Sequence, residues 1–259
     1  MMNPKGPWAA MDSPKTRLHV ESDLERDNPV SLSPAHAHFL ANVLRLGKSD
    51  RVSLFNGRDG EWSCRIEVLG RKSATVHPDE RIREQMPEPG PWLAFAPVKK
   101  ARTDFIVEKA TELGTEHLLP VITSLTVSRR INTERLAANA REAAEQCGRL
   151  TVPGISPPCD LRELMERWPD ERPLLIADET GGGRPIADVL GDIAFANDIP
   201  PTSCGFLIGP EGGFDDSERR VIVEAPNCHP IDLGPMILRS ETAAVAALSC
   251  ARALTDASN

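Results

Sequence analysis

The chain lacks the features of membrane and secreted proteins. Its 259 residues contain no apolar run of about 18 residues, the length that a transmembrane helix needs. The first residues, MMNPKGPWAAMDSPKTR, contain no apolar stretch of the kind that a signal peptide needs. The first ten resemble a loose extension, and Met11 is an alternative start. We therefore expect a cytoplasmic protein with no membrane partner.

The sequence also lacks the cysteine and histidine patterns of disulfide and metal sites. Six cysteines are scattered along the chain, and no two of them form a C-x-x-C pair. This spacing is typical of buried, reduced thiols in a cytosolic protein. His36 and His38 are two residues apart, so on a helix they point to different faces. We expect neither disulfides nor a metal ion.

Basic charge is not in excess, and this excludes one class of function. The formal net charge of −8 at pH 7 argues against a protein that coats nucleic acid without specificity. The first 90 residues are balanced in charge, and the acidic excess lies after them. Local basic patches still allow an acidic chain to bind RNA, so the total charge leaves that question open.

Residues 11–82 have the pattern of a small β-barrel. Short β-rich runs at 51–55, 61–69 and 73–78 are separated by turn residues. One helix is expected among them, with Ser33 as its N-cap. Its apolar stripe is Phe39, Leu40, Val43 and Leu44. Such a barrel suits a binding module, and the polar, Pro-rich residues 83–91 are interpreted as a linker.

Residues 92–259 have a different pattern, in which short apolar strands alternate with amphipathic helices. This alternation predicts a parallel, doubly wound α/β domain. The expected strands are 92–98, 118–122, 173–178, 204–209 and 229–233. The expected helices are 103–113, 133–147, a helix opened by Asp160, a helix opened by Asp215, and 240–254.

Three loops follow strands of this domain and are the candidate ligand site. They are residues 177–185, 209–218 and 233–243. Ligands of such sheets bind beyond the carboxyl ends of the strands, where these loops lie. The P-loop, the dinucleotide-binding glycine pattern and the G-x-S-x-G elbow are all absent. What remains is a site made largely of backbone, which suits a flat base such as adenine.

Several long motifs resemble one family. LIGPEGGF (207–214) and LGPMILRSETAAVAAL (233–248) resemble the knotted SPOUT methyltransferases, in particular the RsmE-type enzymes that methylate N3 of a uridine in 16S ribosomal RNA. HFLANVLRL (38–46) is similar to the PUA-like barrel of that family, and KKARTDFIVEKATELG (99–114) to the start of its catalytic domain. The resemblance runs in order from about residue 17 to 254.

The resemblance implies a C-terminal trefoil knot, a homodimer, and S-adenosylmethionine as cofactor. It also implies that the three loops form the cofactor pocket. The implied cofactor-binding residues are Asp178, Glu179, Ile208, Gly209, Pro210, Glu211, Gly212, Gly213, Leu233, Gly234, Ile237, Leu238, Thr242 and Ala243. Two roles for Glu211 stay open, since its carboxylate either accepts backbone N–H groups of its own loop or faces the substrate.

The reaction implied by the resemblance calls for a cation or a base, because uridine N3 is a poor nucleophile until its proton is lost. Arg239 is the expected cation. Glu241 is either the base or a structural partner of Arg239. The 16S ribosomal RNA of the small subunit is the expected partner, bound through basic loop residues. These are Arg17, Arg45, Lys99, Lys100, Arg102, Arg130 and Arg149.

The sequence departs from the family at two places. Met236 stands where the family usually has arginine, and TSLTVS (123–128) replaces a Ser-Glu-Arg-Ser-like stretch. Met236 puts one cationic contact in doubt and motivates an alternative, a ribosome-binding factor without catalysis. Another alternative is a different SPOUT activity, such as ribose 2′-O or guanosine N1 methylation, against which the block 38–46 argues.

Overall fold

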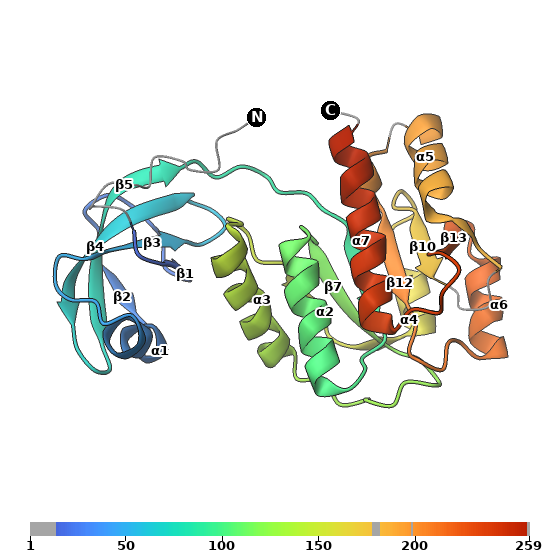
Figure 1. The fold of residues 1–259 in the computed structure, drawn as a ribbon, viewed down its shortest axis with the longest axis horizontal. Helices are drawn as coiled ribbons and strands as arrows, with labels where there is room; N and C mark the ends of the chain where they lie inside the picture. The colour runs from blue at the N-terminus through green and yellow to red at the C-terminus, as the bar shows by residue number, and fades with distance from the viewer. Residues whose placement is uncertain (1–13, 178–181, 198, 258–259) are drawn as a thin grey trace. The chain divides into compact units, whose positions relative to one another are not determined.

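The computed structural model describes residues 14–177, 182–197 and 199–257 (Figure 1). Met11, Asp178 and Glu179 lie outside these residues. The chain divides into two compact units. The first comprises the residues up to Pro87 together with Glu145–Thr151, and the second comprises Glu88–Ala144 together with the residues from Val152 onward. The inclusion of Glu145–Thr151 in the first unit has no signal in the sequence.

The first unit is built on a five-stranded sheet with the order β1-β3-β4-β5-β2. Its strands are β1 (Arg17–His19), β2 (Val30–Leu32), β3 (Arg51–Phe55), β4 (Glu61–Leu69) and β5 (Ala74–Arg83). β1 pairs with β3 in parallel, and the other pairs are antiparallel. The predicted β-rich runs are confirmed, and the small mixed sheet fits the expected PUA-like class.

The helix of this unit differs from its prediction. Ser33 caps α1 (Pro34–His38) as expected, with its hydroxyl accepting from the N–H of His36. The chain then continues as a π-helical turn, η1 (Phe39–Val43). A π turn holds more residues than an α turn, so the expected stripe rotates out of line. Leu40 is buried, but Val43 is 60% exposed, so its place in the stripe is wrong.

The second unit is built on an all-parallel sheet with the order β11-β13-β10-β12-β6-β7-β8. The five predicted strands are confirmed as β6 (Trp92–Phe95), β7 (His117–Ile122), β10 (Leu174–Ala177), β12 (Gly205–Ile208) and β13 (Cys228–Asp232). The two-residue strands β8 (Gly154–Ile155), β9 (Cys159–Asp160) and β11 (Arg184–Pro185) were not predicted. β9 pairs with β7 beside the main path.

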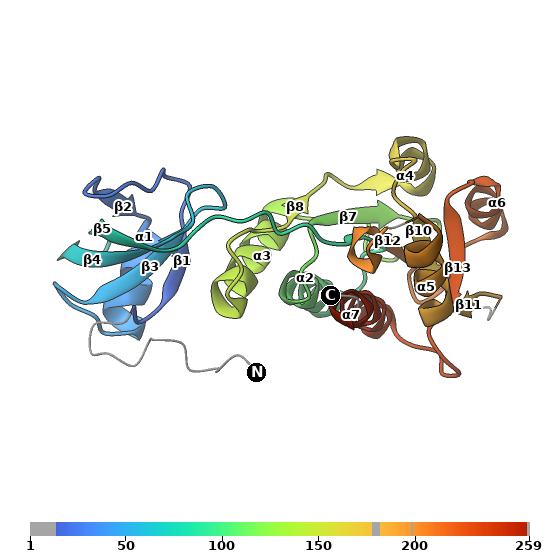
Figure 2. The same ribbon diagram turned by 90° about the horizontal axis from the view of Figure 1, so that it is seen from above.

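Helices cover both faces of this sheet (Figure 2). One face packs α2 (Lys100–Glu112), α3 (Thr133–Cys147), α5 (Ile186–Asn197) and α7 (Ser240–Ala257). The other face packs α4 (Leu161–Arg167) and α6 (Asp216–Glu224). The α/β class is therefore confirmed. α5 was missed, although Ile186, Val189, Leu190 and Ile193 recur in it at helical spacing and are buried.

Three further expectations can be compared with the fold. The six cysteines form no disulfide, but only Cys64 and Cys204 are fully buried and Cys147 is exposed. Among the described residues, no helix is both long and apolar enough to cross a membrane. The trefoil knot stays a prediction, because the contacts bring the segment before α7 to the loop after β12 without defining a threading.

Candidate active site

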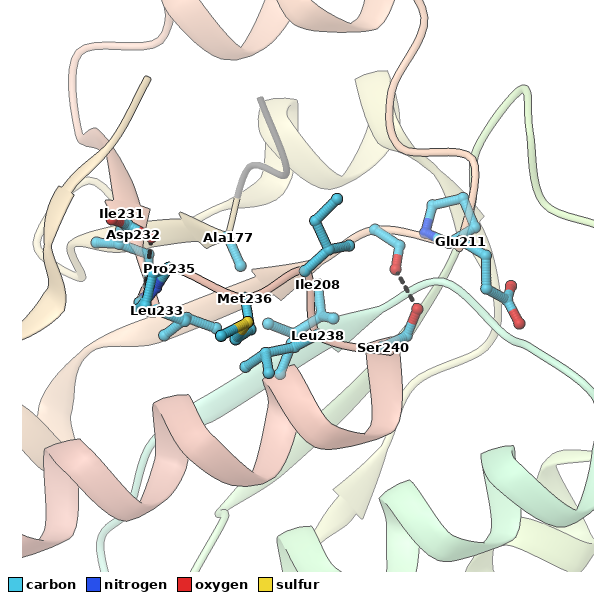
Figure 3. A pocket seen from close by; sticks show the side chains of 15 residues that line it. Ala177, Ile208, Glu211, Ile231, Asp232, Leu233, Pro235, Met236, Leu238 and Ser240 are labelled. Atoms are coloured by element: carbon cyan, nitrogen blue, oxygen red, sulfur yellow. Dashed lines mark hydrogen bonds between the residues drawn. The ribbon is translucent and has the colours of Figure 1, made fainter. Parts of the chain in front are cut away.

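A cavity of about 310 Å³ lies at the carboxyl ends of three neighbouring parallel strands, β10, β12 and β13. Two of the three predicted loops, those after β12 and β13, form most of its wall (Figure 3). It is lined by Ala177, Ile208, Gly209, Pro210, Glu211, Ile231, Asp232, Leu233, Gly234, Pro235, Met236, Ile237, Leu238, Ser240 and Ala243. The cavity therefore lies where a doubly wound sheet binds its ligands.

Most of the predicted cofactor-binding residues line this cavity, but some do not. Gly212, Gly213 and Thr242 are outside its lining, and Asp178 and Glu179 lie outside the described residues. Sequence reasoning missed six lining residues, which are Ala177, Ile231, Asp232, Pro235, Met236 and Ser240. Three of them, Ala177, Ile231 and Asp232, lie at the end of a strand, and that position was the available signal. The other three, Pro235, Met236 and Ser240, were passed over within the loop 233–243, which had already been selected.

Glycine is favoured in the two loops for different physical reasons. Gly213 and Gly234 have φ values of +67° and +114°, in the left-handed region that side chains with a Cβ rarely adopt. At Gly209 space is limiting instead, because an added Cβ would lie 3.0 Å from the buried ring of Phe214. Glycine is therefore favoured at Gly209 and Gly213 in the loop after β12, and at Gly234 in the loop after β13.

Both loops are fixed to the rest of the unit by hydrogen bonds. The hydroxyl of Ser240, at the start of α7, donates to the carbonyl of Gly209 at 2.9 Å (Figure 3). The N–H of Ser124, in the loop after β7, donates to Glu218 at 2.7 Å. Hydroxyl groups of Ser124 and Ser217 hold the pKa of Asp215 well below its usual range. The loop 123–128, which departs from the family in sequence, therefore supports the loop after β12 by packing and hydrogen bonding.

The ionic partners near the cavity differ from those expected. Glu211 accepts from Nη1 of Arg102 at 2.9 Å, a partner that neither expected role of its carboxylate had included. Oε1 of Glu241 lies 3.4 Å from Nε of the same Arg102, and the expected pairing of Glu241 with Arg239 is not seen. Arg239 is exposed just before α7, and none of the described residues forms an ion pair with it.

Two exposed apolar side chains lie at the cavity. Met236 is 74% exposed and Ile237 is 88% exposed, although both line it. Apolar groups that are accessible in a cavity wall are typical of a surface that a ligand or a partner covers. The charged lining residues among those described are Glu211 and Asp232, so the wall is acidic. Such a wall favours a ligand with an apolar face and positive charge.

The predicted RNA-binding residues fall into two groups. Lys99, Lys100 and Arg130 are exposed in the second unit, and Arg45 is exposed in the first. By contrast, Arg17 is held inside the first unit. Its guanidinium pairs with the buried Glu61 at 2.8 Å and donates to the carbonyls of Glu145 and Arg149. Arg102 is likewise paired with two carboxylates, and Arg149 donates to the hydroxyl of Thr151. At least one donor of each of these three arginines is thus used within the protein.

Sequence profiles of two families match the chain. The RNA methyltransferase domain matches residues 87–252, and the RNA methyltransferase PUA domain matches residues 32–79. The chain belongs to this RNA methyltransferase family. The expected resemblance and the enzyme class are thereby confirmed.

Individual members of the RNA methyltransferase family are similar over nearly the whole chain. Ribosomal RNA small subunit methyltransferase E of Rickettsia conorii is 30% identical over 92% of this chain and 95% of its own length. The protein of the same name from Synechocystis is 30% identical over 93% of this chain and 78% of its own. A crystal structure of that methyltransferase from Neisseria gonorrhoeae, bound to S-adenosyl methionine, matches with a TM-score of 0.80 and 28% identity. It covers 92% of this chain and 97% of its own.

Proposed function

We propose that this chain transfers the methyl group of S-adenosylmethionine to N3 of one uridine of 16S ribosomal RNA, the uridine numbered U1498. The observation that carries the proposal is the cavity at the ends of β10, β12 and β13, in a chain that is similar along its length to a methyltransferase crystallised with that cofactor. The names of the curated relatives support the small ribosomal subunit as the substrate.

The cavity fits this cofactor in shape and in charge. Backbone groups of Gly209 and Gly234 allow close approach of a flat base, and Ile208, Leu233 and Leu238 offer apolar contacts. The carboxylate of Asp232, the charged lining residue not paired with Arg102, suits a cofactor that carries a sulfonium and an ammonium group. When bound, S-adenosylmethionine supplies a methyl group that its sulfonium activates.

The chain's own residues then align the nucleobase with the methyl group and stabilise the charge that develops on it. Holding the nucleobase in line with the methyl group lowers the entropic part of the barrier. Negative charge develops on the carbonyls beside N3 as its proton passes to solvent water, and the guanidinium of Arg239 stabilises this charge while the S–CH3 bond breaks and the N3–CH3 bond forms. Of the two roles open to Glu241, the pairing with Arg102 supports the structural one, and Glu241 does not line the cavity. The uridine enters unpaired or flipped, because N3 lies on the base-pairing edge.

RNA binding and self-association complete the proposal. The exposed Arg45, Lys99, Lys100 and Arg130 are proposed to contact phosphates. A homodimer is proposed as the active form, supported by the exposed Met236 and Ile237, because a second copy would remove these apolar groups from water.

Two measurements on the purified protein test the function. Titration calorimetry should show binding of S-adenosylmethionine in the micromolar range or tighter. Small subunits from a strain that lacks the modification should accept labelled methyl groups, whereas subunits from the parent strain, already modified, should not. Cofactor binding without any transfer would favour the ribosome-binding factor over the enzyme. Equal transfer to both kinds of subunit would place the label on another nucleotide.

A further inference from the structure

Arg102 stands at a junction of three segments around the cavity. It lies in the first turn of α2, which begins at Lys100. Its Nη1 donates to Glu211 of the cavity loop at 2.9 Å, and its Nε lies 3.4 Å from Glu241 in the first turn of α7. One guanidinium therefore connects α2, the loop after β12 and α7. A planar guanidinium suits this task, because it presents donors in several directions at once.

The two carboxylates depend on this single cation. Glu241 is only 15% exposed, and its Oε2 is buried without a hydrogen-bond partner among the described residues. A buried carboxylate without a nearby cation is strongly destabilising. The group of Arg102, Glu211 and Glu241 carries a net charge of about −1, which repels rather than attracts a phosphate. Contact with an RNA phosphate is thus a poor explanation of the role of Arg102.

We propose that Arg102 is a positioning residue that fixes the cavity loop, residues 209–213, against the start of α7 through Glu211 and Glu241. Glu211 lines the cavity with part of its side chain, while its carboxylate points away from the apolar residues that surround Met236 (Figure 3). Arg102 thereby holds the backbone of Gly209 and Pro210 in the conformation that accepts a ligand. The role in cofactor binding rests on the proposed function, but the fixing of the loop does not.

Hydrogen exchange of the ligand-free protein tests the fixing of the loop. Arg102→Gln should increase amide exchange of residues 205–215 several-fold, because the loop loses its anchor. Lys109→Gln is the matched control. Lys109 lies on the same helix, is also 30% exposed, and also pairs with two carboxylates, but both of them belong to α2 itself. Unchanged exchange of residues 205–215 in Arg102→Gln would overturn the proposal.

Binding assays separate positioning from RNA contact. Arg102→Gln should raise the Kd for S-adenosylmethionine about tenfold and leave the salt dependence of RNA binding unchanged. Arg102→Lys should recover part of the loss, since a single ammonium reaches one carboxylate at a time. In a Glu211→Gln background the change Arg102→Gln should have a much smaller effect on the cofactor Kd, because the ion pair that joins Arg102 to the cavity loop is already gone. An unchanged cofactor Kd together with a salt slope reduced by about one unit would identify Arg102 as a phosphate contact instead.

These results stay distinguishable from failure of the proposed function. A wild-type protein that binds S-adenosylmethionine but methylates no RNA would contradict the proposed reaction, and both the exchange and the cofactor Kd would still report on Arg102. A wild-type protein that binds no S-adenosylmethionine would contradict the proposed function, and the hydrogen-exchange comparison of Arg102→Gln with Lys109→Gln would then decide the role of Arg102 alone.

Discussion

Arg239 is the first single residue to test, because we propose that it stabilises the charge that develops beside N3. Arg239→Ala should then lower kcat about 100-fold or more, since the proposed cation is removed. The Kd for S-adenosylmethionine should stay within about twofold, since Arg239 does not line the cavity. Single-turnover methyl transfer and calorimetry measure the two quantities. Wild-type turnover by this variant would exclude Arg239 from the reaction.

Two glycines give opposite predictions for stability. Gly205→Ala places a Cβ 2.1 Å from the Cζ2 atom of the Trp168 ring, and overpacking of this kind destabilises by about 1–3 kcal/mol. Gly191→Ala, on the exposed face of α5, meets no atom within 4 Å. It should stabilise the helix by about 0.5–1 kcal/mol. Urea unfolding of both variants measures the difference, and equal stabilities would contradict the packing at Trp168.

At the residue scale, the sequence was a good guide to the cavity and a poor guide to its ion pairs. Ile208 and Leu233 were identified because they lie at strand ends beside glycines, and Leu238 because it lies in the loop that follows β13. The partner of Glu211 was not, because Arg102 is separated from it by more than a hundred positions. An ion pair between distant segments leaves no trace in one sequence unless the fold already places the segments together.

Among the structural elements, α6 begins directly after the cavity loop, and its first residues support that loop. Asp215 caps it in a capping box with Glu218, and Asp215 also accepts a hydrogen bond from Ser124. Asp215→Ala should lower the melting temperature and weaken cofactor binding, whereas Asp216→Ala, one residue further on and exposed, should change neither. Thermal melting and calorimetry test both variants. Identical effects of the two changes would contradict the role of the cap.

The pH dependence of this cap has a definite sign. The pKa of Asp215 is lowered in the folded protein, so its ionised form stabilises the fold above the unfolded pKa. That stabilisation is lost as the pH falls below about 4, where the unfolded chain takes up the proton first. The difference in melting temperature between wild type and Asp215→Ala should therefore shrink in acid. A constant difference from pH 7 to pH 3 would contradict the hydrogen bonds described.

The prediction of helices and strands succeeded where the spacing of apolar residues and the residues at the ends of the element agreed, and it failed where they did not. α3 begins and ends at the predicted residues, since its alanine face and the following Gly148 are local signals. η1 failed because a π turn depends on hydrogen bonds such as Leu44 N–H to Phe39 C=O, which no periodicity reveals. The two-residue strands β8, β9 and β11 are too short to leave a pattern, and only pairing in the fold defines them.

The whole molecule consists of two units, and one buried thiol lies in each. Burial raises the pKa of Cys64 and of Cys204 to about 12, so both thiols stay neutral in the folded protein up to well above pH 9. Only thiolates react quickly with a disulfide reagent. At pH 8 the exposed Cys147 should react within minutes, and Cys64 and Cys204 only in denaturant. Peptide mapping of the labelled thiols checks this order, and early labelling of Cys204 in native protein would contradict it.

The same two thiols also predict how folding stability changes at alkaline pH. Because the folded pKa of each thiol is raised, the unfolded chain loses its thiol protons first, near the ordinary pKa of about 8.5. The contribution of the thiols to folding stability is therefore fully present below that pH and decreases as the pH rises toward 12.

At this scale the two-part organisation and the α/β class could be predicted from the change of pattern near the Pro-rich residues 83–91. The grouping of Glu145–Thr151 with the first unit could not, because it depends on contacts such as Arg17 with the carbonyl of Glu145. The function could not be predicted from the sequence pattern alone either. The chemistry of the cavity indicates a flat, cationic ligand, and membership of the family indicates that this ligand is a methyl donor.

The position of the methyl group is the most direct test of the proposed function. Small subunits lacking the modification are incubated with the protein and S-adenosylmethionine, and their 16S RNA is digested and analysed by nucleoside mass spectrometry with mapping of the modified fragment. The account predicts one N3-methyluridine per subunit, at a single position, formed about 100-fold more slowly when Arg239→Ala replaces the wild type. A methyl group on a ribose 2′-oxygen or on guanosine N1 would contradict it, even though the fold and the cofactor site would stand.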